Sequence, residues 1–239
     1  MIQVGNEPAK ELTPGVEYRT SDSKVDICFV FDTTGSMSDK IDGLVASTVD
    51  LVRDLATLRL DWEITTVPFG DLTVPGDRIV EDQPHVSSLD AAEAQLRSMP
   101  RFGGGGNSGE SSIEAVQAAL RKSYRPDAVK IFILITDEPA LQTATASASL
   151  MAGQLRRAEA IVFVASPDLP YYREWAEIGG GVWVSIQQTM DTSRLRDLLR
   201  ALVREVAMTA KAVHAAGSVK DYLALPGRPV RRALGSGEN

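Results

Sequence analysis

Two polar clusters follow the two most apolar segments of the chain. Val25–Phe31 leads into D-T-T-G-S, which begins at Asp32, and Val129–Ile135 leads into T-D, which ends at Asp137. Both segments have the β-branched and aromatic composition of strands that are buried on both faces. Ligands of open α/β sheets bind beyond the carboxyl ends of such strands. If the two strands are neighbours, Asp32 and Asp137 face each other at one edge of the sheet.

This arrangement predicts a cation site. Two carboxylates that lie close together repel each other unless a cation or a shared proton lies between them. The hydroxyl-bearing residues Thr34 and Ser36 stand next to Asp32 in the chain, and carboxylate and hydroxyl oxygens are ligands that suit Mg²⁺. The alternative interpretation is that these residues only cap a helix. Asp137, at the end of the second strand, favours the metal.

Composition excludes several functional classes. The 239 residues hold 25 Lys+Arg against 32 Asp+Glu, a formal net charge of −7, which argues against an extended nucleic-acid surface. The single cysteine, Cys28, excludes an intrachain disulfide and a cysteine-based zinc site. Residues 1–24 show no signal-peptide core, and no apolar run is long enough to span a bilayer. We expect a cytoplasmic protein that binds neither nucleic acid nor membrane; its oligomeric state stays unknown.

Short apolar runs alternate with runs in which apolar residues recur every three or four positions. This order indicates parallel strands joined by right-handed helical crossovers. The fold prediction is therefore α/β, a doubly wound, mostly parallel central sheet flanked by helices. Val25–Phe31 and Val129–Ile135 lack a polar face, which predicts that they are neighbours near its middle. Turn residues at 75–77 predict one short antiparallel edge strand at Arg78–Glu81.

The chain divides into three predicted regions. Residues 1–24 form an N-terminal extension, 25–210 form the domain, and 211–239 form a weakly ordered tail. The tail is predicted because beyond about Ala215 few apolar residues recur at helical spacing, and glycines, prolines and basic residues are interspersed among them. Tyr222, Leu223 and Leu225 are the exception, and the alternative for them is a short helical turn packed on the domain.

Three strings together resemble a von Willebrand factor type A domain. They are F-V-F-D-T-T-G-S-M-S, F-G-G-G-G-N-S-G-E-S-S-I-E-A and I-L-I-T-D, and the likeness covers roughly 25–207. The resemblance implies a metal-ion-dependent adhesion site that holds Mg²⁺, or Mn²⁺ or Ca²⁺ in its place. The family pattern is D-x-S-x-S, a threonine from a later loop and a further aspartate. The matching residues are Asp32, Thr34, Ser36 and Asp137.

The loop threonine of the family has no direct match here. Asn107 stands where one branch of the family carries an aspartate, and we expect Asn107 or Ser108 to supply a neutral oxygen instead. Asp71 follows the strand expected at Trp62–Phe69. It is interpreted either as an acceptor for metal-coordinated water or as the cap of a turn.

The resemblance also implies a function. Domains of this kind are non-enzymatic interaction modules, in which an Asp or Glu side chain of a partner protein completes the coordination of the metal. Intracellular bacterial members often work beside AAA+ ATPases, or beside kinases and phosphatases, in stress and defence systems. An adaptor role in such a multi-protein system is the expectation that follows.

A phosphatase is the competing hypothesis. D-T-T-G-S also resembles the motif of haloacid-dehalogenase-like phosphatases, in which an aspartate such as Asp32 attacks phosphorus. That chemistry requires a further acid/base residue, a lysine and a distal acidic pair that binds Mg²⁺. Thr34 would fit only the ATPase branch of that class, and Lys130 stands inside a predicted strand. The glycine-rich loop has no place in this mechanism, so the phosphatase ranks second.

Overall fold

The computed structural model describes residues 24–57, 60–105, 107, 109–187, 190 and 192–225. In these residues, five strands form one all-parallel sheet in the order β2-β1-β3-β4-β5. The strands are β1 (Lys24–Asp32), β2 (Asp61–Phe69), β3 (Val129–Ile135), β4 (Ile161–Ser166) and β5 (Trp183–Ser185). The α/β, doubly wound prediction is confirmed, and so is the position of β1 beside β3.

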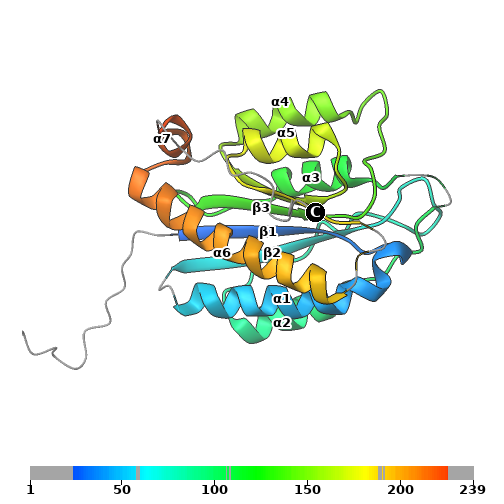
Figure 1. The fold of residues 1–239 in the computed structure, drawn as a ribbon, viewed down its shortest axis with the longest axis horizontal. Coiled ribbons are helices and arrows are strands. Elements are labelled where there is room, and N and C mark those ends of the chain that lie inside the picture. The colour runs from blue at the N-terminus through cyan, green and yellow to red at the C-terminus, as the bar shows by residue number, and fades with distance from the viewer. Residues whose placement is uncertain are drawn as a thin grey trace, which may run out of the picture.

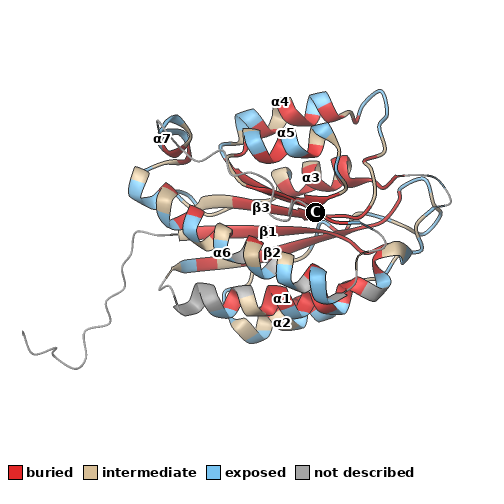
Figure 2. Cartoon of the chain, in the orientation of Figure 1, coloured by how far each residue is buried: buried red, intermediate tan, exposed pale blue. Residues whose placement is uncertain are grey.

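Helices cover both faces of the sheet (Figure 1). One face packs against α1 (Ser38–Thr57), α2 (Leu89–Arg97) and α6 (Thr192–Ala216), and the other against α3 (Ser112–Arg121), α4 (Ala148–Ala158) and α5 (Pro170–Ile178). Successive residues of a strand point to opposite faces, so Phe29 and Phe31 enter the first core and Cys28 and Val30 the second. Figure 2 shows the strands buried along most of their length.

The order of the strands places β1 at the switch point of the sheet. The chain passes from β1 to β2 on one side, and then returns to β3 on the other side. Loops that leave adjacent strands in opposite directions open a crevice at the carboxyl ends, which is where open α/β sheets bind their ligands. The register pairs Phe31 with Ile135, so Asp32 and Thr136 follow at the same level.

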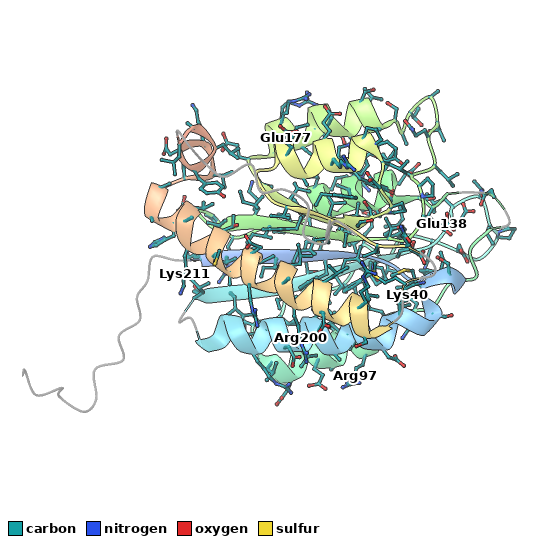
Figure 3. The ribbon with its side chains drawn as sticks, viewed as in Figure 1. Lys40, Arg97, Glu138, Glu177, Arg200 and Lys211 are labelled. Carbon is teal, nitrogen blue, oxygen red and sulfur yellow. The ribbon has the colours of Figure 1, made fainter. Side chains whose placement is uncertain are left out.

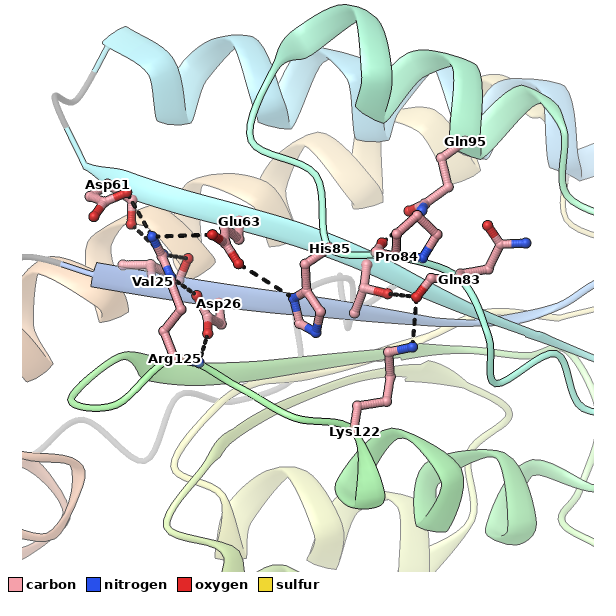
Figure 4. A network of polar contacts seen from close by, with 11 residues as sticks. Val25, Asp26, Asp61, Glu63, Gln83, Pro84, His85, Gln95, Lys122 and Arg125 are labelled. Carbon is pink, nitrogen blue, oxygen red and sulfur yellow. Dashed lines mark hydrogen bonds and ion pairs between the residues drawn. The ribbon is translucent and has the colours of Figure 1, made fainter.

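The amino ends of the same strands are joined by Arg125. Its guanidinium Nε lies 2.7 Å from Oδ1 of Asp26, a fully buried residue of β1, and its Nη1 lies 2.7 Å from Oδ1 of Asp61 in β2. The backbone N–H of Arg125 donates to Oδ2 of Asp26 at 2.7 Å. Figure 4 shows this network, with His85 and Glu63 beside it. The turn before β3 is thereby attached to β1 and β2, far from the carboxyl ends.

The predicted antiparallel edge strand is reduced to single bridges. Ile79 pairs with Phe69 and Val86 pairs with Ile64, both antiparallel and isolated. The segment runs antiparallel beside β2 from Phe69 back to Ile64 and pairs with it only at separate points. Pro84, which has no backbone N–H, interrupts a continuous ladder.

The structure differs from the predicted weakly ordered tail over residues 211–225. Helix α6 continues to Ala216, and a short helix α7 (Val219–Ala224) follows it. Val213, Val219 and Tyr222 are buried in the same core as β1. Some core-facing positions of α6 are occupied by alanine, such as the buried Ala210. Their small side chains make the hydrophobic pattern of the helix weak in the sequence. Residues 1–23 and 226–239 lie outside the described residues. None of the described helices has the length and apolar character needed to cross a bilayer.

Candidate functional site

The candidate site begins where β1 ends. Asp32 is fully buried, and its Oδ1 accepts hydrogen bonds from the backbone N–H of Thr34 at 3.0 Å and from the Thr34 hydroxyl at 2.6 Å. This aspartate-centred turn reverses the chain into the 3₁₀ turn Gly35–Met37 and then into α1. The backbone N–H of Thr33 donates to the Phe69 carbonyl at 3.0 Å, which ties the turn to β2.

The end of β3 meets this turn through two hydroxyl groups. The Thr136 hydroxyl donates to Oδ2 of Asp32 at 2.7 Å, and the Ser36 hydroxyl donates to Oδ1 of Asp137 at 2.8 Å. The Thr34 and Ser36 hydroxyl oxygens lie 3.3 Å apart. A continuous chain of oxygens therefore runs from Asp32 through Thr34 and Ser36 to Asp137. The four residues that the sequence predicted to meet are together at this edge.

Lys40, which the sequence analysis did not single out, completes this arrangement. From the first turn of α1, its Nζ donates to Oδ2 of Asp137 at 2.9 Å and to the Ser36 carbonyl at 2.8 Å. Only 5% of the Lys40 side chain is exposed, and none of the Asp137 side chain. Figure 3 labels Lys40 and Glu138 at this end of the molecule. A lysine in the first turn of a predicted amphipathic helix is normally expected to face solvent. The sequence alone therefore does not predict that Lys40 forms a buried ion pair.

Glu110 was also missed as a site residue. Only 4% of it is exposed, and its Oε2 has no hydrogen-bond partner among the described residues. A Cβ atom placed on Gly104 would lie 3.1 Å from Cβ of Thr34 and 3.2 Å from Oε1 of Glu110. The glutamate therefore faces the Thr34 turn across a glycine whose φ of 72° is in the left-handed region.

The two buried carboxyl groups have raised pKa values. Burial raises the pKa of Glu110 to about 8, with further increases from the charges of Asp32, Asp71 and Glu138, against which a Thr34 hydrogen bond acts. Burial also raises the pKa of Asp32 to about 6, although the Thr34 and Thr136 hydrogen bonds lower it. Burial shifts both groups toward the neutral form relative to a carboxyl group in water, and a nearby cation would shift them back toward the ionised form.

Asp71 and Asn107 lie together beside the oxygen chain. Asp71 is buried, and its Oδ1 accepts from the backbone N–H and the hydroxyl of Thr73 at 2.8 and 2.7 Å. Its Oδ2 has no partner among the described residues. The Asn107 amide donates to the Thr73 hydroxyl at 3.1 Å, and no described contact joins Asn107 to Asp32 or Asp137. Ser108, the other predicted loop ligand, lies outside the described residues.

The donor set fits a hard divalent cation. Asp32, Thr34, Ser36 and Asp137 offer carboxylate and hydroxyl oxygens, and one buried oxygen each of Asp71 and Glu110 has no hydrogen-bond partner among the described residues. Among the described residues, no three Asp, Glu, His or Cys side chains are placed to hold a metal ion together. Carboxylates used sparingly alongside neutral oxygens and water are typical of Mg²⁺ sites.

The family model for the von Willebrand factor A domain matches residues 26–178. That range is more than half of the chain. The chain belongs to the von Willebrand factor A domain family. Domains of this family are generally non-enzymatic modules of protein–protein interaction. No curated protein matches the chain.

Solved structures show the same fold at low identity. Proximal thread matrix protein 1 from the mussel byssus is 17% identical with a TM-score of 0.58, over 77% of this chain and 48% of that one. The von Willebrand factor type A protein from Catenulispora acidiphila is 18% identical with a TM-score of 0.53, over 76% and 42%. BatB from Bacteroides thetaiotaomicron, a conserved hypothetical protein, is 17% identical with a TM-score of 0.56, over 78% and 99%.

The chain therefore spans about half the length of the mussel protein and less of the Catenulispora protein. The von Willebrand factor A assignment does not favour the phosphatase hypothesis. The geometry argues in the same direction. Both carboxylate oxygens of Asp32 accept hydrogen bonds, and the residue is fully buried. An attacking nucleophile needs an oxygen that can reach phosphorus.

Proposed function

We propose that this chain is a metal-dependent protein-interaction module that recognises an acidic side chain of a partner protein. Asp32, Thr34, Ser36 and Asp137 would hold the ion, with Mg²⁺ as the expected ion and Mn²⁺ or Ca²⁺ as alternatives. The observation that supports this proposal is the continuous oxygen chain at the switch point of the sheet, with buried carboxylate oxygens beside it that have no partner in the described part of the chain.

The two aspartates would supply charge to the ion, and each also orients a hydroxyl ligand. Asp32 lies at the end of a central strand and orients the Thr34 hydroxyl, while Asp137 orients the Ser36 hydroxyl. Ser36 is the half-buried member of the group, and so it lies nearest to an approaching partner. A bound divalent cation would supply net positive charge and an exchangeable position that a partner's carboxylate can fill.

The partner would meet a mixed surface around this position. Leu72 follows Asp71 in the chain and is 48% exposed, and its backbone N–H is held by the Ser111 hydroxyl at 2.9 Å. Asn107 is exposed on the neighbouring loop. An acidic residue flanked by an apolar side chain would match both the ion and this rim.

The family likeness extends the proposal to biology. We place the module in the cytoplasm, as an adaptor in a bacterial multi-protein system that contains an AAA+ ATPase or a kinase and phosphatase pair. This step rests on analogy with the family.

Metal titration tests the proposed site. Chelator-treated wild type, Asp32→Asn and the surface control Asp50→Asn are titrated with MgCl₂ and MnCl₂ by calorimetry. Wild type and Asp50→Asn are expected to bind, and Asp32→Asn to lose binding while it stays folded. Partner capture from a lysate should then require Mg²⁺ and be reversed by chelator. Equal metal binding by wild type and Asp32→Asn would refute the site.

The same proteins test the alternative chemistry. Wild type is incubated with a generic phosphoester and Mg²⁺, and phosphate release is measured. We expect no turnover above the buffer rate. Turnover that Asp32→Asn abolishes would establish the phosphatase in place of the interaction module.

A further inference from the structure

Among the described residues at this edge of the sheet, buried acidic side chains outnumber the basic side chains that pair with them. The acidic side chains are Asp32, Asp71, Glu110 and Asp137, and all of them are buried. In the part of the chain that the structure describes, Lys40 forms its ion pair with Asp137. Oδ2 of Asp71 and Oε2 of Glu110 have no partner among the described residues. Buried carboxylates without partners are costly unless a ligand compensates them.

Glu110 is held in place by its backbone. Its N–H donates to the Pro139 carbonyl at 2.9 Å, and its carbonyl accepts from the N–H of Leu141 at 2.9 Å. This pairing attaches Glu110 to the loop that carries Asp137. These bonds fix the backbone of Glu110, and its carboxyl group faces the Thr34 turn across Gly104.

Glu110 occupies the glycine-rich loop region from which the family supplies its threonine. Asn107, the residue expected there, donates its amide to the Thr73 hydroxyl, and among the described residues no hydrogen bond joins it to Asp32 or Asp137. Glu110 instead lies against Thr34 across Gly104. Among the described residues no three acidic side chains are placed to hold an ion together, and we therefore assign Glu110 a place outside the group of direct ligands.

We infer that Glu110 is a positioning residue of the metal site: its buried carboxyl group, which lies beside Thr34 and outside the group of ligands, raises the affinity of the site for the divalent cation. This inference rests on the proposed function, since it concerns the same ion. It assigns a cost as well as a benefit. In the metal-free protein Glu110 is a buried acid without a compensating partner among the described residues, so it lowers the stability of the metal-free fold.

The test compares wild type, Glu110→Gln and Glu114→Gln. Glu114 is a matched control, because it lies one turn further along, in α3, is half-buried, and also has an Oε2 without a partner. Each chelator-treated protein is titrated with MgCl₂ by calorimetry, and its metal-free melting temperature is measured in chelator. We expect Glu110→Gln to weaken Mg²⁺ binding by about ten- to hundredfold, while its metal-free melting temperature equals or exceeds that of wild type.

The remaining outcomes separate this inference from the proposed function. Glu114→Gln should bind Mg²⁺ like wild type. If wild type binds Mg²⁺ and Glu110→Gln binds it equally well, the role of Glu110 is refuted while the site stands. A clearly lower metal-free melting temperature in Glu110→Gln would show that the residue supports the fold, and would also refute the inference. Absence of binding by wild type would overturn the proposed function and this inference together.

Discussion

Lys40 and Asp137 form a buried ion pair between the start of α1 and the end of β3, with Nζ 2.9 Å from Oδ2. The same ammonium also donates a hydrogen bond to the Ser36 carbonyl at 2.8 Å. Lys40 therefore fixes the Ser36 turn against β3. It holds the candidate ligands in register while no ion is bound.

Lys40→Met should destabilise the metal-free protein by about 3–5 kcal/mol, because it leaves the Asp137 carboxylate buried without its partner. Urea denaturation in chelator measures the loss. Arg53→Met removes an exposed pair with Asp50 and should cost less than about 1 kcal/mol. Mg²⁺ should restore part of the stability of Lys40→Met. A loss no larger than that of Arg53→Met would contradict the role assigned to Lys40.

The sequence was sufficient to predict the site residues that lie at the carboxyl ends of the two central strands. Val25–Phe31 and Val129–Ile135 read as buried strands because neither has a polar face, and parallel neighbours end at one edge. Asp32 and Asp137 could therefore be placed together before any coordinates. The fold class followed from the same alternation of strands and helices.

Lys40 and Glu110 could not be predicted in the same way. Lys40 is one of several charges at the start of an amphipathic helix, and its burial depends on the 3₁₀ turn that points α1 at Asp137. Glu110 reads as a loop residue, and only its pairing with the loop after β3 turns it toward Thr34. Alanines hid the core face at the end of α6, where Val213 is buried, because small side chains weaken the hydrophobic period.

Arg125→Met should destabilise the fold by about 3–5 kcal/mol, since it leaves Asp26 fully buried without its guanidinium. The double change Asp26→Leu and Arg125→Met removes both charges and should recover most of this loss. Urea denaturation of the single and double variants measures the coupling. If the double variant is as unstable as the sum of its single changes, the pair is not the source of the effect.

Helix α7 should contribute to stability, contrary to the tail that the sequence suggests. A chain that ends at Gly217 loses the buried side chains of Val219 and Tyr222, compared with a chain that ends at Leu225. We expect the shorter chain to be less stable by about 2–4 kcal/mol, measured by urea denaturation. Tyr222→Ala in the longer chain should reproduce part of the loss. Equal free energies of unfolding for the two chains would show that the packing of α7 does not stabilise the fold.

The metal-free protein should lose stability as pH rises from about 4 to about 8. The pKa of Glu110 is raised from 4.5 to about 8 in the folded chain, and that of Asp32 from 3.8 to about 6. Over this range the unfolded chain releases protons that the folded chain retains, so rising pH favours unfolding. The stability that these two groups contribute is fully present below their pKa values in the unfolded chain. It is lost as the pH rises through their pKa values in the folded chain.

Glu110→Gln isolates the larger part of this effect. Glutamine mimics the neutral carboxyl group, so the variant and wild type should have similar stability near pH 4. Wild type should fall progressively below the variant up to about pH 8, and the difference should then level off. Urea denaturation in chelator at a series of pH values gives the two curves. A difference that stays constant with pH would mean that Glu110 is not held neutral by its burial beside Thr34.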